Sequence, residues 1–248
     1  MFKPEFVENE IYHIYNRGVE KRNIFLDKKD YLRFVHDLFE FNNEEMTLSS
    51  NIRFASRCPA KVDASCLNQC LEVGPPNIDK PRKLLVEILA FCLMPNHYHL
   101  LLKQKSDDGI IKFMQKTGTG YVMYFNQRYE RVGPLYQGRF KAVIINRSEH
   151  FDYIPYYIHF NPLDLIEPNW RDGIIKNYKK TIKFLNSYRW SSHLDYLGKK
   201  NFPSVTQREF LLREFQGEKN YKANIKKWFK EITQTQKIDK EFRSIILE

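Results

Sequence analysis

The chain has 248 residues, of which 42% are hydrophobic, and its 40 Lys and Arg give a formal net charge of +10. That length suffices for one domain with extensions, or for two small domains, with a buried core. The longest apolar run, at 84–94, contains Glu87 and is shorter than the roughly 20 residues of a membrane-spanning helix. A transmembrane segment is therefore not predicted, and the first ten residues lack the pattern of an export signal, so we expect a cytoplasmic protein.

The basic charge indicates a polyanionic partner, with nucleic acid first, because each basic side chain placed on a phosphate releases a condensed counterion. A basic surface that only keeps the protein in solution is the alternative. The four cysteines, Cys58, Cys66, Cys70 and Cys92, have spacings that fit no zinc knuckle or ribbon. We interpret them as free thiols, with a loose metal clip at 58–70 as the alternative.

A strand and a helix are predicted before a long insertion. Residues 10–19 (EIYHIYNRGV) are rich in β-branched and aromatic residues and end in Arg17-Gly18, which is typical of a strand that runs into a turn. Asp27 can cap the helix that follows, where apolar residues recur at three- and four-residue spacing. From about 44 to 82 the sequence has four prolines and no sustained period, which predicts a mobile insertion.

The next part of the chain predicts two strands, a helix, a strand and another helix. The strands at 84–93 and 97–104 are separated by a Met-Pro-Asn turn. Helical spacing follows at 106–130 and strand character at 138–146, and a helix at 148–162 begins at a Ser148 cap and ends at Asn161-Pro162.

This order predicts an α+β fold, a ferredoxin-like βαββαβ antiparallel sheet with one further helix after the fourth strand. In that fold the first and third strands are central, so the strand at 97–104 would lie in mid-sheet, with one face free of helices or partly covered. We assign residues 1–165 to this domain, with the insertion at about 44–82. Residues 166–248 are assigned to an appended C-terminal helical region that contacts DNA.

His97 and His99 raise the question of a site on this sheet. Residues i and i+2 of a strand point the same way, with Cα atoms about 6.6 to 6.8 Å apart, so the pair can share one metal ion. Tyr98 would point to the opposite face, into packing beneath a helix. For an isolated His-x-His, simple hydrogen bonding on an exposed strand face is the more frequent explanation.

The sequence around these histidines resembles a known family. MPNHYHLLL, at 94–102, is similar to the His-hydrophobic-His (HUH) motif of single-tyrosine HUH endonucleases, in the form found in REP-associated tyrosine transposases. Four further segments resemble the family in the family's order: YHIYNRGVEKRNIF (12–25), GPLYQGRFKA (133–142), YIHFNPLD (157–164) and YRWSSHLDYLG (188–198). Tyr98 between the histidines, Tyr136 in place of a tryptophan, and the long insertion depart from the family pattern.

The resemblance implies a set of site residues and a cofactor. Tyr157 would be the nucleophile, His97 and His99 would be metal ligands, and Asn161 would be the third ligand. The spacing is physically sensible, because residues i and i+4 lie on the same face of a helix. The implied metal is Mg²⁺ or Mn²⁺, although the same ligands would also bind Zn²⁺.

The implied activity is metal-dependent cleavage and rejoining of single-stranded DNA through a 5′-phosphotyrosine link and a free 3′-OH. The implied substrate is hairpin-forming repeat DNA, which would bring the protein to the nucleoid, and a monomer is favoured over a homodimer.

Several residues have competing interpretations. Tyr153 and Tyr156 lie on the same predicted helix as Tyr157, and only the family resemblance selects Tyr157. His159 falls on another face of that helix, where a structural role is expected. Arg17, Arg139 and Lys141 are predicted to contact DNA phosphates, and a solvated basic face is the alternative.

Three other functions remain open at this point. A ferredoxin-like module could bind single-stranded DNA or RNA without catalysis, but the aromatic signature of RNA-recognition domains is absent from GRFKAVIIN. A metal-dependent hydrolase would cleave without a covalent intermediate. A decayed transposase relative would bind DNA only.

Overall fold

A four-stranded antiparallel sheet forms the centre of the protein. The computed structural model describes residues 5–45 and 82–235. The strands are β1 (Ile11–Arg17), β2 (Val86–Met94), β3 (His97–Gln104) and β4 (Lys141–Ile144), in the spatial order β2-β3-β1-β4. This is the ferredoxin-like order, so the predicted fold class and the central positions of β1 and β3 are confirmed. The strand expected at 138–146 is shorter than predicted.

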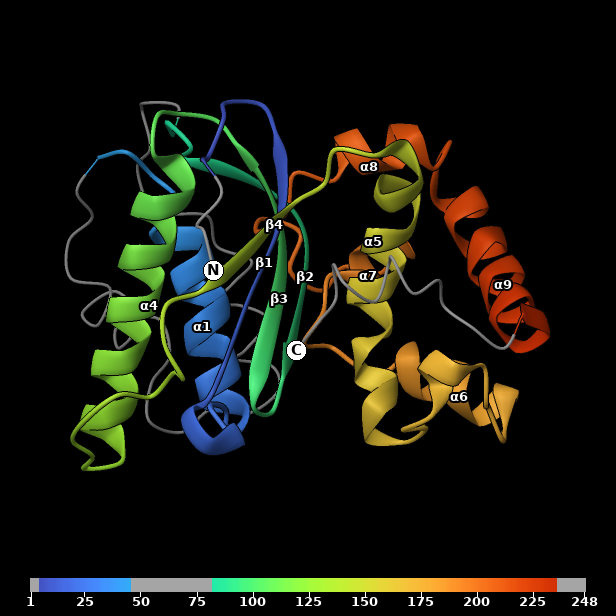
Figure 1. Ribbon diagram of the computed structural model, residues 1–248, viewed down its shortest axis with the longest axis horizontal. Helices are drawn as coiled ribbons and strands as arrows, with labels where there is room; N and C mark the ends of the chain where they lie inside the picture. Colours follow the sequence, from blue (N-terminus) through green and yellow to red (C-terminus); the bar gives the residue numbers. More distant parts are fainter. Residues whose placement is uncertain (1–4, 46–81, 236–248) are drawn as a thin grey trace.

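One face of the sheet is covered by α1 (Lys28–Glu40) and α4 (Gly109–Arg128), as Figure 1 shows with the sheet nearly edge-on. A short 3-10 turn, η1 (Val19–Lys21), lies between β1 and α1. Apolar side chains from both helices and from alternate strand positions form the core of this layer: Phe34, Val35, Leu38, Phe113, Tyr121, Phe125, Tyr12, Ile14, Tyr98, Leu100 and Leu102. The alternation of strand residues leaves the other face of β1 and β3 to the histidines.

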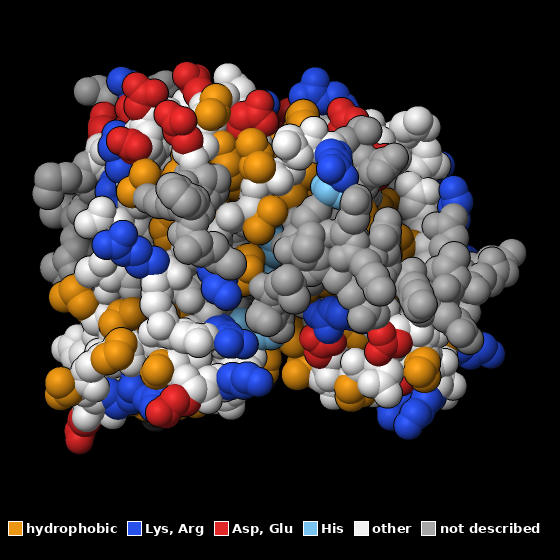
Figure 2. Space-filling model, in the orientation of Figure 1, with side chains coloured by type: hydrophobic (Ala, Val, Ile, Leu, Met, Phe, Trp, Pro, Cys, Tyr) orange, Lys and Arg blue, Asp and Glu red, His pale blue; other side chains and the backbone are white. Residues whose placement is uncertain are grey.

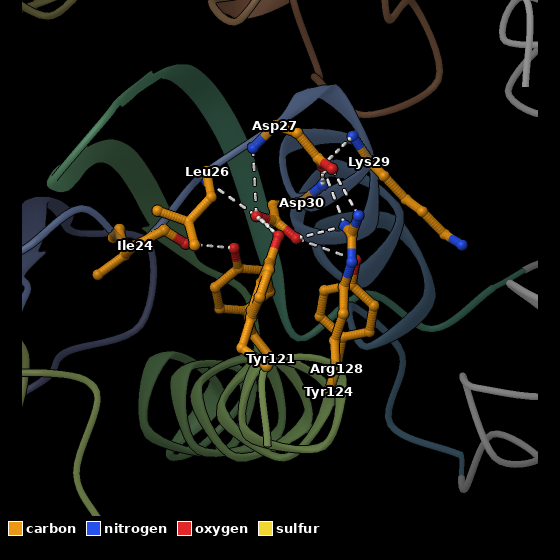
Figure 3. A network of polar contacts seen from close by, with 9 residues as sticks. Ile24, Leu26, Asp27, Lys29, Asp30, Tyr121, Tyr124 and Arg128 are labelled. Atoms are coloured by element: carbon orange, nitrogen blue, oxygen red, sulfur yellow. Dashed lines mark hydrogen bonds and ion pairs between the residues drawn. The ribbon is translucent and has the colours of Figure 1, made fainter. Parts of the chain in front are cut away.

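Polar contacts fix α1 against α4 at one end of this layer (Figure 3). Asp27 caps α1 as predicted, because its carboxylate accepts hydrogen bonds from the Lys29 and Asp30 backbone N–H groups. The buried Asp30 carboxylate accepts from the Tyr124 hydroxyl (3.0 Å) and from Arg128 Nη1 (2.7 Å). Burial tends to raise the pKa of Asp27, but its bonds to Arg128 lower it overall. These contacts hold α1 and α4 together beneath the sheet.

The other face of the sheet is covered by α5 (Ser148–Phe160) and by the elements that follow it (Figure 1). These are η2 (Asn161–Leu165), η3 (Trp170–Asp172), α6 (Tyr178–Leu185), α7 (His193–Tyr196), α8 (Glu209–Glu214) and α9 (Glu218–Thr235). We expected this face to be free of helices or partly covered, and the structure covers it more fully than that. The physical reason is a second apolar core, in which Leu101 of the sheet packs in one cluster with Ile154, Ile158, Trp170 and Trp228.

The start of α5 differs from the prediction, whereas its end agrees with it. The N-cap of α5 is Arg147, without a side-chain cap bond, and Ser148 is already the first helical residue. The helix ends at Phe160, and the Asn161-Pro162 pair begins the 3-10 turn η2, in line with the predicted stop. The insertion expected at about 44–82 lies almost entirely outside the described residues, as do Cys58, Cys66 and Cys70. Cys92 is buried and is not part of a disulfide.

The segment after α6 closes the β2 edge of the sheet. Leu93 N–H donates to the Trp190 carbonyl (2.8 Å) and Ser192 N–H donates to the Phe91 carbonyl (3.0 Å). The Ser191 backbone forms a bridge with Cys92. The WSS sequence therefore pairs with a strand edge that would otherwise expose unpaired backbone groups.

Two buried histidines join this segment to α5 and α9. His159 contacts the Ser192 hydroxyl (2.8 Å) and the Tyr221 hydroxyl (2.7 Å), and His193 contacts Tyr221 (2.8 Å) and Asn186 Oδ1 (3.2 Å). One proton arrangement satisfies all four contacts with both rings neutral: Ser192 donates to His159, His159 to Tyr221, Tyr221 to His193, and His193 to Asn186. This places His159 in a structural network, away from the candidate site.

We expect the stability of the protein to fall steeply as the pH drops below about 6.5. Burial lowers the pKa of His193 to about 3, and burial followed by the nearby His193 lowers the pKa of His159 well below its ordinary value. Below pH 6.5 the unfolded chain therefore binds a proton at each of these two histidines, whereas the folded protein does not. Each histidine therefore lowers the unfolding free energy by up to about 1.4 kcal/mol for every pH unit, as the pH falls from 6.5 toward 3.

Urea unfolding at pH 7, 6 and 5 measures this dependence. The variant that combines His159→Gln with His193→Gln is the control, because it removes both titrating groups. Its unfolding free energy should be lower at pH 7 but should depend less on pH. Equal slopes for this variant and the wild type would contradict the prediction.

Candidate functional site

The sheet face under α5 carries a row of polar and aromatic side chains. In the β1–β3 register, Tyr15 lies opposite His99 and Arg17 lies opposite His97. Directly paired residues share a face, so these four side chains and His13 all point toward the α5 side. Tyr98 points the other way and is buried against Phe34 of α1, with ring centroids 5.0 Å apart, as predicted.

The two motif histidines are neighbours with different surroundings. Their ring centroids lie 5.0 Å apart, and His99 is fully buried whereas His97 is half-buried. His97 Nδ1 lies 2.6 Å from Asn96 Oδ1, and His99 Nδ1 lies 2.9 Å from His13 Nε2. Each ring is therefore held through its Nδ1 side. Histidine ligands that bind a metal through Nε2 are typically oriented in this way.

Tyr157 is the tyrosine of α5 that faces the histidines. Its ring centroid lies 5.8 Å from that of His99 and 6.2 Å from that of His13, both nearly perpendicular. Tyr153 packs instead against Trp228 (5.2 Å), and Tyr156 stacks on Tyr221 (5.4 Å). Burial raises the pKa of Tyr156 to about 12 and raises that of Tyr153 further. Of the three tyrosines, Tyr157 is therefore the one whose ring lies beside the motif histidines.

Asn161 lies directly below Tyr157 but is already engaged. Its Nδ2 donates to the Tyr157 carbonyl (3.0 Å), and its Oδ1 accepts from Arg171 Nη2 (2.8 Å). Asn161 is fully buried at the junction of α5 and η2. Because an amide oxygen has two lone pairs, the bond to Arg171 leaves capacity for a second interaction at Oδ1.

Sequence reasoning missed two residues of this site. Arg171 contacts the Tyr157 hydroxyl at 3.4 Å, and it forms an ion pair with Asp164. Burial would lower the pKa of Arg171, but the nearby Tyr157 hydroxyl and Asp164 raise it above its ordinary value. No motif marks Arg171. His13 could have been found, because it alternates with Tyr15 and Arg17 along β1.

The three residues predicted to bind DNA line one cavity beside His97. The cavity has a volume of about 240 Å³ and is lined by Tyr15, Asn16, Arg17, His97, Gln137, Gly138, Arg139 and Lys141. Figure 2 shows His side chains in the hollow near the middle of this face, with Lys and Arg side chains beside them. Arg139 lies just before β4 and not within it, so its position comes from the 137–138 loop, which a hydrogen bond from Asn16 Nδ2 to the Gly138 carbonyl (3.0 Å) holds.

Among residues 5–45 and 82–235, no three His, Cys, Asp or Glu side chains are grouped so that they could hold a metal ion. A metal at the motif histidines would therefore need an amide, phosphate or water oxygen to complete its coordination. In the same described part of the chain, no helix is long and apolar enough to cross a membrane.

Comparison with known proteins agrees with the sequence motifs. Residues 79–161 match the family model described as "Transposase IS200 like". Over this segment the chain is similar to the IS200-like transposase family. The segment contains β2, β3, α4, β4 and α5, with both motif histidines and Tyr157, and it ends at Asn161, the first residue of η2. The resemblance derived from the motifs is confirmed over these residues, whereas the similar segments at 12–25 and 188–198 lie outside the match.

A solved structure described as a REP-associated tyrosine transposase bound to a REP hairpin is similar to the chain. The TM-score is 0.47 at 13% sequence identity, and the superposition covers 83% of this chain and 89% of that one. No curated protein matches the sequence.

Proposed function

We propose that the protein is a transposase-like endonuclease and strand transferase that cuts single-stranded DNA through attack by Tyr157. The observation that carries this proposal is that the buried Tyr157 lies beside His99 and is bonded to the buried Asn161, in a segment that matches the IS200-like transposase family model. Tyr157 Oη attacks the scissile phosphorus, the bond to the 3′ oxygen breaks, and a 5′-phosphotyrosine link forms. The phenol proton is matched by the proton that the 3′-OH gains.

We further propose that His97, His99 and Asn161 hold a divalent ion, Mg²⁺ or Mn²⁺. The donors fit such an ion, because both imidazoles are held through Nδ1 and Asn161 offers an amide oxygen. Bound there, the ion would polarise the non-bridging oxygens of the scissile phosphate. The nearby Arg171 cation argues for modest affinity until the anionic DNA is present.

The path of the DNA is proposed to run through the cavity beside His97. Arg17, Arg139 and Lys141 line this cavity. His97 also lines it, so the cavity leads to the motif histidines. A DNA strand whose phosphates contact these cations would reach the site from this side. We propose hairpin-forming repeats as the substrate, a monomer as the acting form, the nucleoid as its location and further DNA contacts from the C-terminal helices.

A binding-only protein is the second candidate function. The observation that favours it is the burial of Tyr157, whose side chain has no exposed surface. Cleavage requires the scissile phosphate to reach the hydroxyl, so the surrounding side chains would have to move when DNA binds.

Incubation with a single-stranded DNA library and Mn²⁺ separates these functions. The proposed enzyme should give protein–DNA adducts that survive SDS, and the trapped fragments should share a sequence when they are read. A hydrolase would give cut DNA without adducts, and a binding-only protein would give neither.

We expect the cations of the cavity to dominate the salt dependence of DNA binding. Replacing Arg17, Arg139 and Lys141 together with Gln should reduce the slope of log Kd against log salt by about 2, because each contact with a single-strand phosphate contributes roughly 0.7. The measurement is fluorescence anisotropy with a single-stranded oligonucleotide at several salt concentrations. The Tyr157→Phe background prevents cleavage during the titration.

The control variant lowers the net charge by the same amount, but on the helices that cover the opposite face of the sheet. Lys28, Lys29 and Lys112 lie on α1 and α4, so their replacement with Gln should leave the slope nearly unchanged. Similar losses in both triple variants would show that only net charge matters and that the cavity is not a DNA path.

A further inference from the structure

Arg171 reaches the candidate site from outside the family segment. It lies in η3, ten residues beyond the end of the match at 161. Its Nη2 donates to Asn161 Oδ1 at 2.8 Å and to the Tyr157 hydroxyl at 3.4 Å. The guanidinium carbon also lies 5.4 Å from the centroid of the Tyr157 ring. One cation therefore contacts both Tyr157 of α5 and Asn161, which directly follows α5.

The orientation of this guanidinium is fixed by its own neighbours. Nη1 is bonded to Asp164 Oδ1, which also accepts from Trp170 Nε1 (2.6 Å). The guanidinium carbon lies 4.7 Å from the Trp170 ring centroid, and the Arg171 side chain is only 26% exposed. A planar cation held at one edge by a carboxylate and on one face by an indole can direct its remaining donors at a defined point. Here Nη2 is directed at two neighbouring atoms, Tyr157 Oη and Asn161 Oδ1.

We infer that Arg171 is part of the strand-transfer site, where it holds Tyr157 and Asn161 in place and stabilises negative charge on Tyr157 Oη. This inference rests on the proposed function. When Oη attacks phosphorus, its proton leaves and the P–O3′ bond breaks. When the 3′-OH attacks in reverse, the P–Oη bond breaks and the phenol regains a proton. In both directions the phenol oxygen carries negative charge beside the guanidinium.

The location of the cation makes this effect large. An oriented donor in a site shielded from water stabilises developing charge more than the same donor does in solvent, because it does not need to reorganise. Loss of one such donor typically slows catalysis by about 100- to 1000-fold. A residue that only anchors η3 to α5 would instead affect the unfolding free energy and DNA binding along with the rate.

The test compares single-turnover cleavage with DNA affinity for wild type, Arg171→Gln, Arg171→Lys and Arg171→Ala. Arg189→Gln is the matched control, because Arg189 is also a half-buried cation over an aromatic ring, 5.1 Å from the Trp190 centroid, but does not contact Tyr157. We expect Arg171→Gln to cut about 100-fold more slowly with nearly unchanged Kd for the oligonucleotide. Arg171→Lys should recover part of the rate, and added guanidinium should partly restore Arg171→Ala.

The outcomes separate this inference from the proposed function. If wild type forms adducts and Arg171→Gln cuts at the wild-type rate, the inference alone is wrong. It is also wrong if Arg171→Gln and Arg189→Gln lose rate equally, or if the rate loss follows the loss of affinity and neither Lys nor guanidinium restores it. If wild type forms no adduct, the proposed function fails and this inference fails with it. Thermal unfolding of each variant identifies those that do not fold.

Discussion

Tyr157→Phe should abolish the covalent protein–DNA adduct while leaving single-stranded DNA binding nearly intact. The substitution removes one hydroxyl, whose contact with Arg171 is long at 3.4 Å, and keeps the ring, whose centroid lies 6.3 Å from that of Trp170. The fold should therefore survive. Without a nucleophile the 5′-phosphotyrosine link cannot form, so the expected loss is complete. The measurement is SDS gel electrophoresis of a labelled oligonucleotide after incubation with Mn²⁺.

Tyr153→Phe and Tyr156→Phe are the matched controls for this prediction. Both hydroxyls lie on α5, but their rings pack against Trp228 and Tyr221, away from the histidines. Both variants should form adducts at close to the wild-type rate. If one of them loses the adduct and Tyr157→Phe keeps it, the nucleophile has been assigned to the wrong tyrosine.

The fold and part of the candidate site could be predicted from local patterns. The period of the apolar residues and the Met-Pro-Asn turn were enough for the order of the strands, and hence for the central place of His97 and His99. Alternation along β1 and β3 placed Tyr98 in the core. The family motif selected Tyr157 among three tyrosines, and the structure places that residue beside His99.

The cover over the histidine face and the role of Arg171 could not be predicted in the same way. Both depend on how segments after residue 166 pack onto α5. The spacing of apolar residues shows which face of an element is buried, but not which distant segment packs against that face. Arg171 lies in the short, irregular turn η3, where neither helical nor strand spacing applies. The predicted division into 1–165 and 166–248 therefore separates Arg171 from the Tyr157 hydroxyl that it contacts.

The cover also changes how the proposed reaction must begin. His99, Tyr157 and Asn161 are fully buried, whereas His97 and Arg17 are half-buried and Arg139 and Lys141 are exposed. DNA would therefore meet the cations of the cavity first and reach His97 before the hydroxyl. Binding energy from these outer phosphates can offset the cost of opening the contacts around Tyr157. Cleavage should then depend on DNA length on the cavity side.

The three proposed metal ligands should differ in how strongly their loss affects cleavage. We expect the combination of His97→Ala and His99→Ala to be inactive at any Mn²⁺ concentration, because it removes both nitrogen ligands. Asn161→Ala should remain active but need at least about tenfold more Mn²⁺, because two of three protein ligands remain. Asn161→Gln should keep partial activity, since it retains an amide oxygen. The measurements are nicking rate against Mn²⁺ concentration and calorimetric Mn²⁺ binding in the presence of uncut DNA.

Asn161→Asp distinguishes metal binding by Asn161 from its contact with Arg171. A carboxylate can bind the ion and also pair with the Arg171 guanidinium, which bonds to Asn161 Oδ1 at 2.8 Å in the wild type. Tighter Mn²⁺ binding by Asn161→Asp together with weaker binding by Asn161→Ala would support a ligand role. If calorimetry and nicking give the same Mn²⁺ dependence for Asn161→Ala and wild type, Asn161 serves only to hold Arg171 and the end of α5. The third ligand, an oxygen donor, would then have to come from the DNA phosphate or from water.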